Sequence, residues 1–135
     1  LATSKPNLHV HGSVHHSKIP TMLQECDIGL LPMPNLPVWT IASPLKRSEY
    51  ISSGLLVVGI DHSGHHLPVK NGNSAWYQLF DQQTFVDDAV KQIQQWIDDG
   101  DFATLSQQAR TYAETNLAWS KTIQPLVDFV GSVEE

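Results

Sequence analysis

The sequence predicts an α/β fold, a partial Rossmann-like parallel sheet with flanking helices, in a single domain that spans residues 1–135. Three observations predict it. Residues 55–60 form a continuous apolar run rich in valine, which is typical of a parallel strand covered on both faces. A short, sharply bounded helical segment comes directly before this run. The last third of the chain places apolar residues at helical spacing, as in helices that pack on a sheet.

The helix before the predicted strand has clear start and stop signals. Ser43 is suited to cap the free N–H groups at its start, and Pro44 fits the first helical position. Gly54 lies where a residue in the left-handed conformation would end the helix. In an open α/β sheet, ligands bind at the carboxyl ends of the strands, where a helix N-terminus attracts anions. We therefore expect residues 43–46 to face a phosphate group, with Lys46 adding positive charge.

The carboxyl-terminal third predicts three helices. The first begins after Thr84 and ends before Gly100. Its apolar face is expected to pack on the sheet through Val86, Ala89, Val90, Ile93 and Ile97. The second begins after Asp101, is apolar through Leu105, Ala109, Tyr112 and Ala113, and stops at Asn116. Ser120 opens the third, which Pro125 must bend or delay.

Two tryptophans, the cysteine and one aspartate are expected to have structural roles and no role in ligand binding. Trp96 and Trp119 are expected in the core or between helices, because both lie far in sequence from the crevice loops. Cys26, the single cysteine, is expected as a small buried apolar side chain, which leaves no disulfide framework and no thiolate metal site. Asp61 is expected to start a turn after the strand.

Composition narrows the classes of function. The net charge is −6 and the few Lys and Arg residues are scattered, so we expect no nucleic-acid partner. No apolar stretch approaches the roughly 20 residues of a membrane span, and no signal peptide is seen. These features predict a cytoplasmic protein, with peripheral membrane contact left open.

The motif around the helix resembles the donor-binding core of the family-4 glycosyltransferases, retaining enzymes of GT-B fold. The resemblance lies in Ser-Pro-Leu-Lys at residues 43–46, Glu49-Tyr50, Gly54 and the apolar strand that ends at Asp61. It extends over nearly the whole chain. It implies a strand at residues 8–11, a helix at 19–26, a strand at 28–31, and a turn at 71–75 before a last short strand.

The resemblance implies a site for a nucleotide-diphosphate-sugar donor. Glu49 would bind the ribose hydroxyls and the helix start would hold the diphosphate. Ile41 stands where the family has a second glutamate near the donor sugar, which is the main departure from the pattern. The catalytic residues cannot be named. The expected donor-binding residues are Ser43, Pro44, Leu45, Lys46, Glu49, His16, Ser63, Gly64 and His65.

The resemblance also implies partners. The acceptor would be a glycan or a lipid-linked molecule in polysaccharide biosynthesis, held by an amino-terminal acceptor domain. Because the family has two further strand–helix units before the strand at residues 8–11, we expect this domain to be truncated at its start and inactive alone. The family generally needs no bound cation, and no carboxylate pair suited to magnesium is visible, so no metal or other cofactor is expected.

Two alternatives stay open. The chain is a non-catalytic nucleotide-binding or subunit-interaction module if Ile41 removes an essential contact. The second alternative is a zinc site, because His9 and His11 would share one face of a strand. The other histidines lie in segments 15–16 and 62–66, but no spacing matches a known zinc motif.

Overall fold

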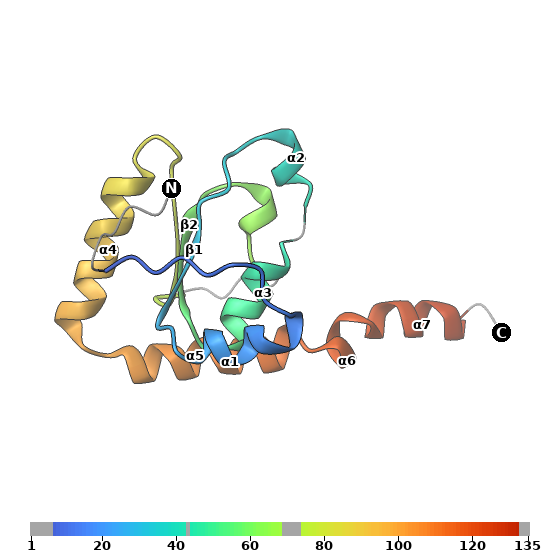
Figure 1. Ribbon diagram of the computed structural model, residues 1–135. Helices are drawn as coiled ribbons and strands as arrows, with labels where there is room; N and C mark the ends of the chain where they lie inside the picture. Colours follow the sequence, from blue (N-terminus) through green and yellow to red (C-terminus); the bar gives the residue numbers. More distant parts are fainter. Residues whose placement is uncertain (1–6, 43, 69–73, 133–135) are drawn as a thin grey trace.

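The computed structural model describes residues 7–42, 44–68 and 74–132, and Figure 1 shows its arrangement. The elements in chain order are η1 (His16–Lys18), α1 (Ile19–Leu23), β1 (Ile28–Leu31), α2 (Pro37–Thr40), α3 (Leu45–Ser52), β2 (Leu56–Ile60), η2 (Ser63–His65), β3 (Tyr77–Phe80), α4 (Phe85–Asp99), α5 (Phe102–Asn116), α6 (Trp119–Thr122) and α7 (Gln124–Ser132).

The described strands form one parallel sheet in the order β1-β2-β3. Ile28 pairs with Leu56, and Val57 pairs with Tyr77. All five residues of the central strand β2 are buried, as its continuous apolar sequence predicts for a strand covered on both faces. The α/β class with a small, open, Rossmann-like parallel sheet is confirmed, as are the strands expected at residues 28–31 and 55–60.

Helices cover the sheet and close the core. α3 packs on β1 and β2, α4 packs on β2 and β3, and α5 contacts both α3 and β2. Trp76 is completely enclosed at the centre of this packing, and its ring lies 5.3 Å from that of Tyr112 on α5. In Figure 1, α6 and α7 run away from the rest of the chain.

The turn from α3 into β2 depends on a glycine. Gly54 has φ of 78°, the left-handed conformation that the sequence predicted at this helix end. A Cβ atom at this position would also lie 2.7 Å from Ser106 Oγ of α5. Both the backbone conformation and the close approach of α5 therefore require glycine. At the other end, Pro44 precedes α3 as its N-cap residue instead of taking the first helical position.

The expectations for the amino-terminal part are partly wrong. Residues 8–11 form no strand and are exposed, because none of the described strands pairs with them and an unpaired extended segment has no hydrogen-bonded ladder to hold it. α1 ends at Leu23, short of the predicted end at Cys26. Cys26 is therefore exposed in the loop before β1, not buried. The turn expected at residues 71–75 falls largely outside the described residues, and β3 follows it as expected.

The carboxyl-terminal helices begin and end close to the predicted positions, but only part of the predicted face of α4 packs on the core. Ala89 and, as predicted, Trp96 are buried and Ile93 packs against the core, whereas Val86, Val90 and Ile97 are exposed. The three-stranded sheet is narrow, so it covers only the side of α4 that carries Ala89 and Trp96. α5 buries the predicted face. None of the described helices combines the length and apolar character that crossing a bilayer requires.

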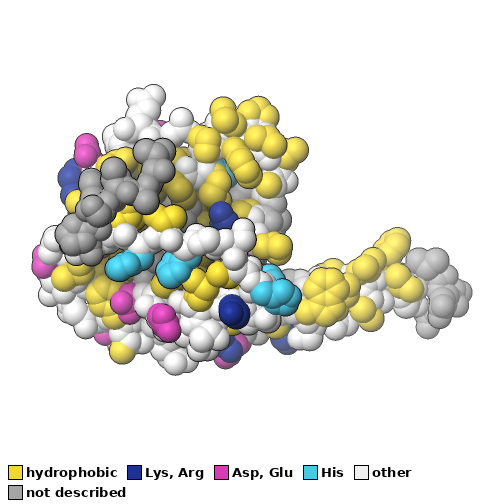
Figure 2. Space-filling model, in the orientation of Figure 1, with side chains coloured by type: hydrophobic (Ala, Val, Ile, Leu, Met, Phe, Trp, Pro, Cys, Tyr) yellow, Lys and Arg dark blue, Asp and Glu magenta, His cyan; other side chains and the backbone are white. Residues whose placement is uncertain are grey.

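The predicted third helix is divided. α6 ends at Thr122 and α7 begins at Gln124, which agrees with the expected effect of Pro125 on a helix start. The prediction that Trp119 is packed is wrong, since 76% of its surface is exposed. Trp119 belongs to a run of hydrophobic side chains along α6 and α7, visible in Figure 2.

Candidate functional site

Two cavities border α3: one lies at its start, beside the loop that follows β2, and the other runs along the helix to its carboxyl end. The first, which we call the histidine cavity, has a volume of about 310 Å³. Its lining residues are Met33, Trp39, Ala42, Pro44, Leu45, Lys46, His62 and His65. The second, which we call the glutamate cavity, has a volume of about 420 Å³. Its lining residues are His16, Ile19, Pro20, Leu23, Gln24, Leu45, Ser48, Glu49, Ser52, Ser53 and Arg110. Leu45 borders both cavities, so a ligand that spans them passes the first turn of α3.

The first turn of α3 offers N–H groups to a ligand. Pro44, its N-cap residue, makes no side-chain capping bond, and the first backbone hydrogen bond here runs from the Arg47 N–H to Pro44 O at 3.1 Å. Leu45 and Lys46 precede that bond, and their N–H groups are not donated to any backbone acceptor of the described residues. The Lys46 side chain is exposed and lines the histidine cavity. Ser43, the predicted cap, lies outside the described residues.

Glu49 is the acidic residue of the glutamate cavity. It lies one turn into α3, and its side chain is one-third exposed. Its Oε1 lies 3.7 Å from His16 Nε2, close enough for an ion pair when the imidazole is protonated. The structure therefore brings together two predicted site residues that are 33 positions apart in the sequence. The carboxylate remains accessible as a hydrogen-bond acceptor.

Arg110 is a residue of the glutamate cavity that the sequence reasoning missed. Its Nε donates to Glu114 Oε1 at 2.7 Å, and its Nη1 donates to the carbonyl oxygen of Ser52 at the end of α3. It adds a basic group to the lining of this cavity. Its position on α5 gave no signal in the sequence, because only the packing of α5 on α3 brings it to this site.

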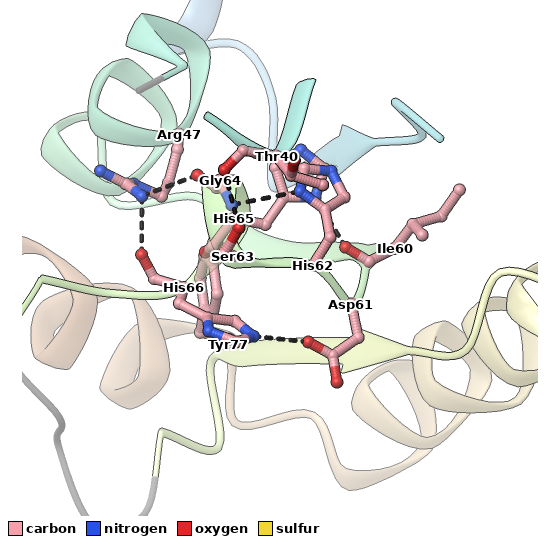
Figure 3. A network of polar contacts seen from close by, with 10 residues as sticks. All are labelled: Thr40, Arg47, Ile60, Asp61, His62, Ser63, Gly64, His65, His66 and Tyr77. Carbon is pink, nitrogen blue, oxygen red and sulfur yellow. Dashed lines mark hydrogen bonds and ion pairs between the residues drawn. The ribbon is translucent and has the colours of Figure 1, made fainter. Parts of the chain in front are cut away.

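The segment after β2 folds into a compact loop, drawn in Figure 3. The N–H of Gly64 donates to His62 Nδ1 at 3.2 Å, so His62 caps the short helix η2. Ser63 Oγ donates to the carbonyl oxygen of Thr40 at 2.7 Å. Asp61 Oδ1 accepts a hydrogen bond from His66 Nε2 at 2.7 Å, which fits its predicted role at a turn. These bonds tie the loop to α2 and to itself.

Arg47 holds this loop from α3. It is only 7% exposed, and its Nη1 donates to the carbonyl oxygens of Gly64 at 3.0 Å and His66 at 2.6 Å. In the described residues no carboxylate lies within ion-pair distance of its guanidinium group. Arg47 is therefore a buried positioning residue, because the two carbonyl oxygens of the loop accept hydrogen bonds from its guanidinium group.

Gly64 allows the loop to approach α2. A Cβ atom at this position would lie 2.3 Å from Trp39 O and 2.9 Å from Ala42 O, both backbone atoms that cannot rotate away. We expect Gly64→Ala to lower the free energy of unfolding by about 1 to 3 kcal/mol, as for other overpacked sites. Denaturant unfolding measures the change. Gly12→Ala is the control, since nothing lies within 4 Å of its Cβ position. Equal losses in both variants would contradict the close approach.

His65 is fully buried at the base of the histidine cavity. Its Nδ1 donates to the carbonyl oxygen of Ile60 at 2.7 Å, and its own carbonyl accepts from the Tyr77 hydroxyl at 2.5 Å. Burial lowers the pKa of His65, and electrostatic interactions with His62, Arg47 and His66 lower it further, against the opposing effect of the Ile60 hydrogen bond. The neutral imidazole is thus the form that the fold favours.

The lowered pKa of His65 predicts acid sensitivity. Since the folded protein disfavours the protonated imidazole, the contribution of His65 to stability is fully present above the ordinary pKa of 6.5 and is lost as the pH falls through its lower folded-state value. We expect the wild type to lose stability relative to a His65→Asn variant as the pH falls below 6.5, because only the wild type has an imidazole to protonate at this position. Denaturant unfolding over a pH series measures it. A constant difference would contradict this prediction.

The predicted site residues divide into two groups. Those that line a cavity are Pro44, Leu45, Lys46, Glu49, His16 and His65. Ser63 and Gly64 line neither and serve the loop itself. Ile41 is 88% exposed and also lies outside both linings. The cavity residues that were not predicted from the sequence include Met33, Trp39 and His62. The first two precede the motif at residues 43–46 and the third follows β2, and only the fold brings them to the cavity.

The described histidines do not gather into a metal centre. In residues 7–42, 44–68 and 74–132 no group of three or more His, Cys, Asp or Glu side chains is placed to hold one ion. Comparisons of the chain with protein-family models, with curated proteins and with solved structures found no match.

Proposed function

We propose that this chain is the donor-binding part of a glycosyltransferase, which binds a nucleotide-diphosphate sugar for transfer to a glycan or lipid-linked acceptor. The observation that carries the proposal is the accessible carboxylate of Glu49 in a cavity that runs along α3 and reaches Leu45 in its first turn. A carboxylate is suited to accept hydrogen bonds from vicinal ribose hydroxyls, and a helix N-terminus is suited to a diphosphate.

The two cavities fit the parts of such a donor in order. The nucleoside would lie in the glutamate cavity against Glu49 and His16. The diphosphate would pass Leu45 and receive the N–H groups of the first turn of α3, with the Lys46 ammonium nearby. The sugar would enter the histidine cavity. Charge that develops on the departing nucleoside diphosphate would then be stabilised by fixed dipoles and by Lys46, so the proposal needs no bound cation.

The acceptor and the remaining catalytic groups would come from an amino-terminal acceptor domain. We propose a cytoplasmic location, with peripheral membrane contact where the acceptor is lipid-linked. Retention of the anomeric configuration follows only from the resemblance of the motif.

Calorimetric titration of the chain with UDP, GDP and ADP tests the proposal. We expect one of them to bind with one-site stoichiometry, and inorganic phosphate to compete weakly. Lys46→Ala should weaken binding several-fold through loss of a charge-assisted contact, and Lys91→Ala, an exposed cation on α4, should not. Absence of binding by all three nucleotides would reject the proposal.

A non-catalytic nucleotide-binding module is the second candidate. The observation that favours it is Ile41, an exposed apolar residue outside both cavities where the resembled family places a glutamate. It predicts the same nucleotide binding without sugar transfer. Transfer of a radiolabelled sugar by the protein joined to its acceptor domain would reject this alternative.

A further inference from the structure

The histidine cavity contains a pair of buried imidazoles that its surroundings leave incomplete. His62 is 5% exposed and His65 is fully buried, and their ring centroids lie 3.8 Å apart. The two residues come from the same loop after β2 and both line the cavity. Each has one buried ring nitrogen, Nε2, without a hydrogen-bond partner among the described residues.

The hydrogen bonds at Nδ1 fix the tautomer of each ring. The backbone N–H of Gly64 is a donor, so His62 Nδ1 must accept, and the proton of the neutral ring is on Nε2. The carbonyl oxygen of Ile60 is an acceptor, so His65 Nδ1 must donate, and Nε2 of the neutral ring carries a lone pair. The two unpaired atoms are therefore one donor, on His62, and one acceptor, on His65.

A ligand group for this pair must both accept and donate. A hydroxyl group does so, because its oxygen has lone pairs and its hydrogen can rotate. A fully ionised phosphate or a carboxylate offers acceptors alone and would leave His65 Nε2 unpaired. Each unpaired buried group costs about 1 to 3 kcal/mol, so the difference in pairing selects between these ligands.

The rest of the cavity wall suits the same ligand class. Met33, Pro44, Leu45 and the ring of Trp39 supply apolar surface. A sugar ring presents C–H faces that pack against apolar and aromatic groups, and hydroxyls at its edge. The volume of the histidine cavity, about 310 Å³, lies in the range of small-molecule sites.

We propose that the histidine cavity binds a monosaccharide through one hydroxyl group, which accepts a hydrogen bond from His62 Nε2–H and donates one to His65 Nε2. Both nitrogens are shielded from solvent, so this binding mode requires a small rotation of the rings toward the cavity. The assignment of this monosaccharide as the sugar of a nucleotide donor rests on the proposed function, whereas the hydroxyl site itself does not.

Two asparagine variants separate the roles of the nitrogens. Asn at position 62 can still accept from the Gly64 N–H through its side-chain oxygen, and Asn at position 65 can still donate to Ile60 O through its amide. Both His62→Asn and His65→Asn thus remove Nε2 while the loop keeps its Nδ1-type bond. Equal denaturant unfolding curves of variant and wild type at neutral pH would establish that the loop is intact.

Two measurements then test the inference. Imidazole ¹⁵N–¹H NMR of the wild type, titrated with glucose, galactose and mannose, should shift the Nε2 signals of His62 and His65 with at least one hexose, and not with inorganic phosphate. In calorimetry with UDP, GDP and ADP and their hexose conjugates, each Asn variant should lose roughly fivefold to tenfold in affinity for the conjugate. The affinity of each variant for the nucleotide alone should equal that of the wild type.

The outcomes distinguish this inference from the proposed function. Hexose-induced Nε2 shifts without any nucleotide binding would support the hydroxyl site and reject the donor role. Nucleotide binding without hexose shifts, and with conjugate affinity unchanged in both variants, would overturn the hydroxyl site and leave the donor role intact. Shifts produced by phosphate and by no hexose would also overturn it, because the cavity would then be an anion site.

Discussion

Replacement of Glu49 by alanine is expected to weaken nucleoside diphosphate binding by about 1 to 3 kcal/mol, because the ribose hydroxyls lose a charged acceptor and remain unpaired in the complex. The carboxylate is one-third exposed and 3.7 Å from His16 Nε2, so no strong internal contact holds it when the ligand is absent. Calorimetric titration of wild type and variant with the nucleotide that binds best measures the change.

Two controls make the Glu49 prediction specific. Glu25→Ala removes an exposed carboxylate outside both cavities and should leave affinity unchanged. The 2′-deoxynucleotide should bind the wild type less tightly than the ribonucleotide, but the Glu49→Ala variant should bind the two about equally, as a double-mutant cycle requires for one shared contact. Equal discrimination by wild type and variant would remove Glu49 from ribose recognition.

Replacement of Arg47 by alanine is expected to lower the free energy of unfolding by about 2 to 4 kcal/mol, since the buried carbonyl oxygen of Gly64 and the partly buried one of His66 lose their donor. The loop that carries His62 and His65 would lose its attachment to α3. Denaturant unfolding measures the loss of stability, and imidazole NMR signals report the disorder of the loop.

Lys91→Ala is the matched control for Arg47. Lys91 forms an exposed ion pair with Asp88 at 3.4 Å, and such pairs contribute at most about 1 kcal/mol. An Arg47→Ala variant as stable as the Lys91→Ala variant would show that the two hydrogen bonds of Arg47 contribute no more than an exposed ion pair and that the loop is stable without them.

The local elements of the fold were largely predictable because their signals are local. The continuous apolar run of β2, the glycine that ends α3 and the boundaries of α4 all follow from interactions within a few residues. The strand expected at residues 8–11 failed because a strand depends on a partner elsewhere in the chain, and no described strand pairs with it.

The face that a helix buries was less predictable than the helix itself. The apolar residues of α4 form one stripe, and periodicity did not decide how much of that stripe the narrow sheet would cover. The sheet covers the side with Ala89 and Trp96. Trp119 shows the same limit, since a large apolar side chain is buried only where the chain brings a surface to cover it.

The sequence by itself determined the chemistry available at the edge of the sheet: a helix start with Lys46, a carboxylate one turn later at Glu49, and a histidine-rich loop after β2. Only the tertiary structure decided which of these groups are free. Arg47 and Gly64 hold the loop, Glu49 meets His16 across the chain, and Nδ1 bonds fix the free nitrogens of His62 and His65. The reason is physical: residue type sets what a group can donate or accept, but burial and the position of distant backbone atoms set which partners it has already found.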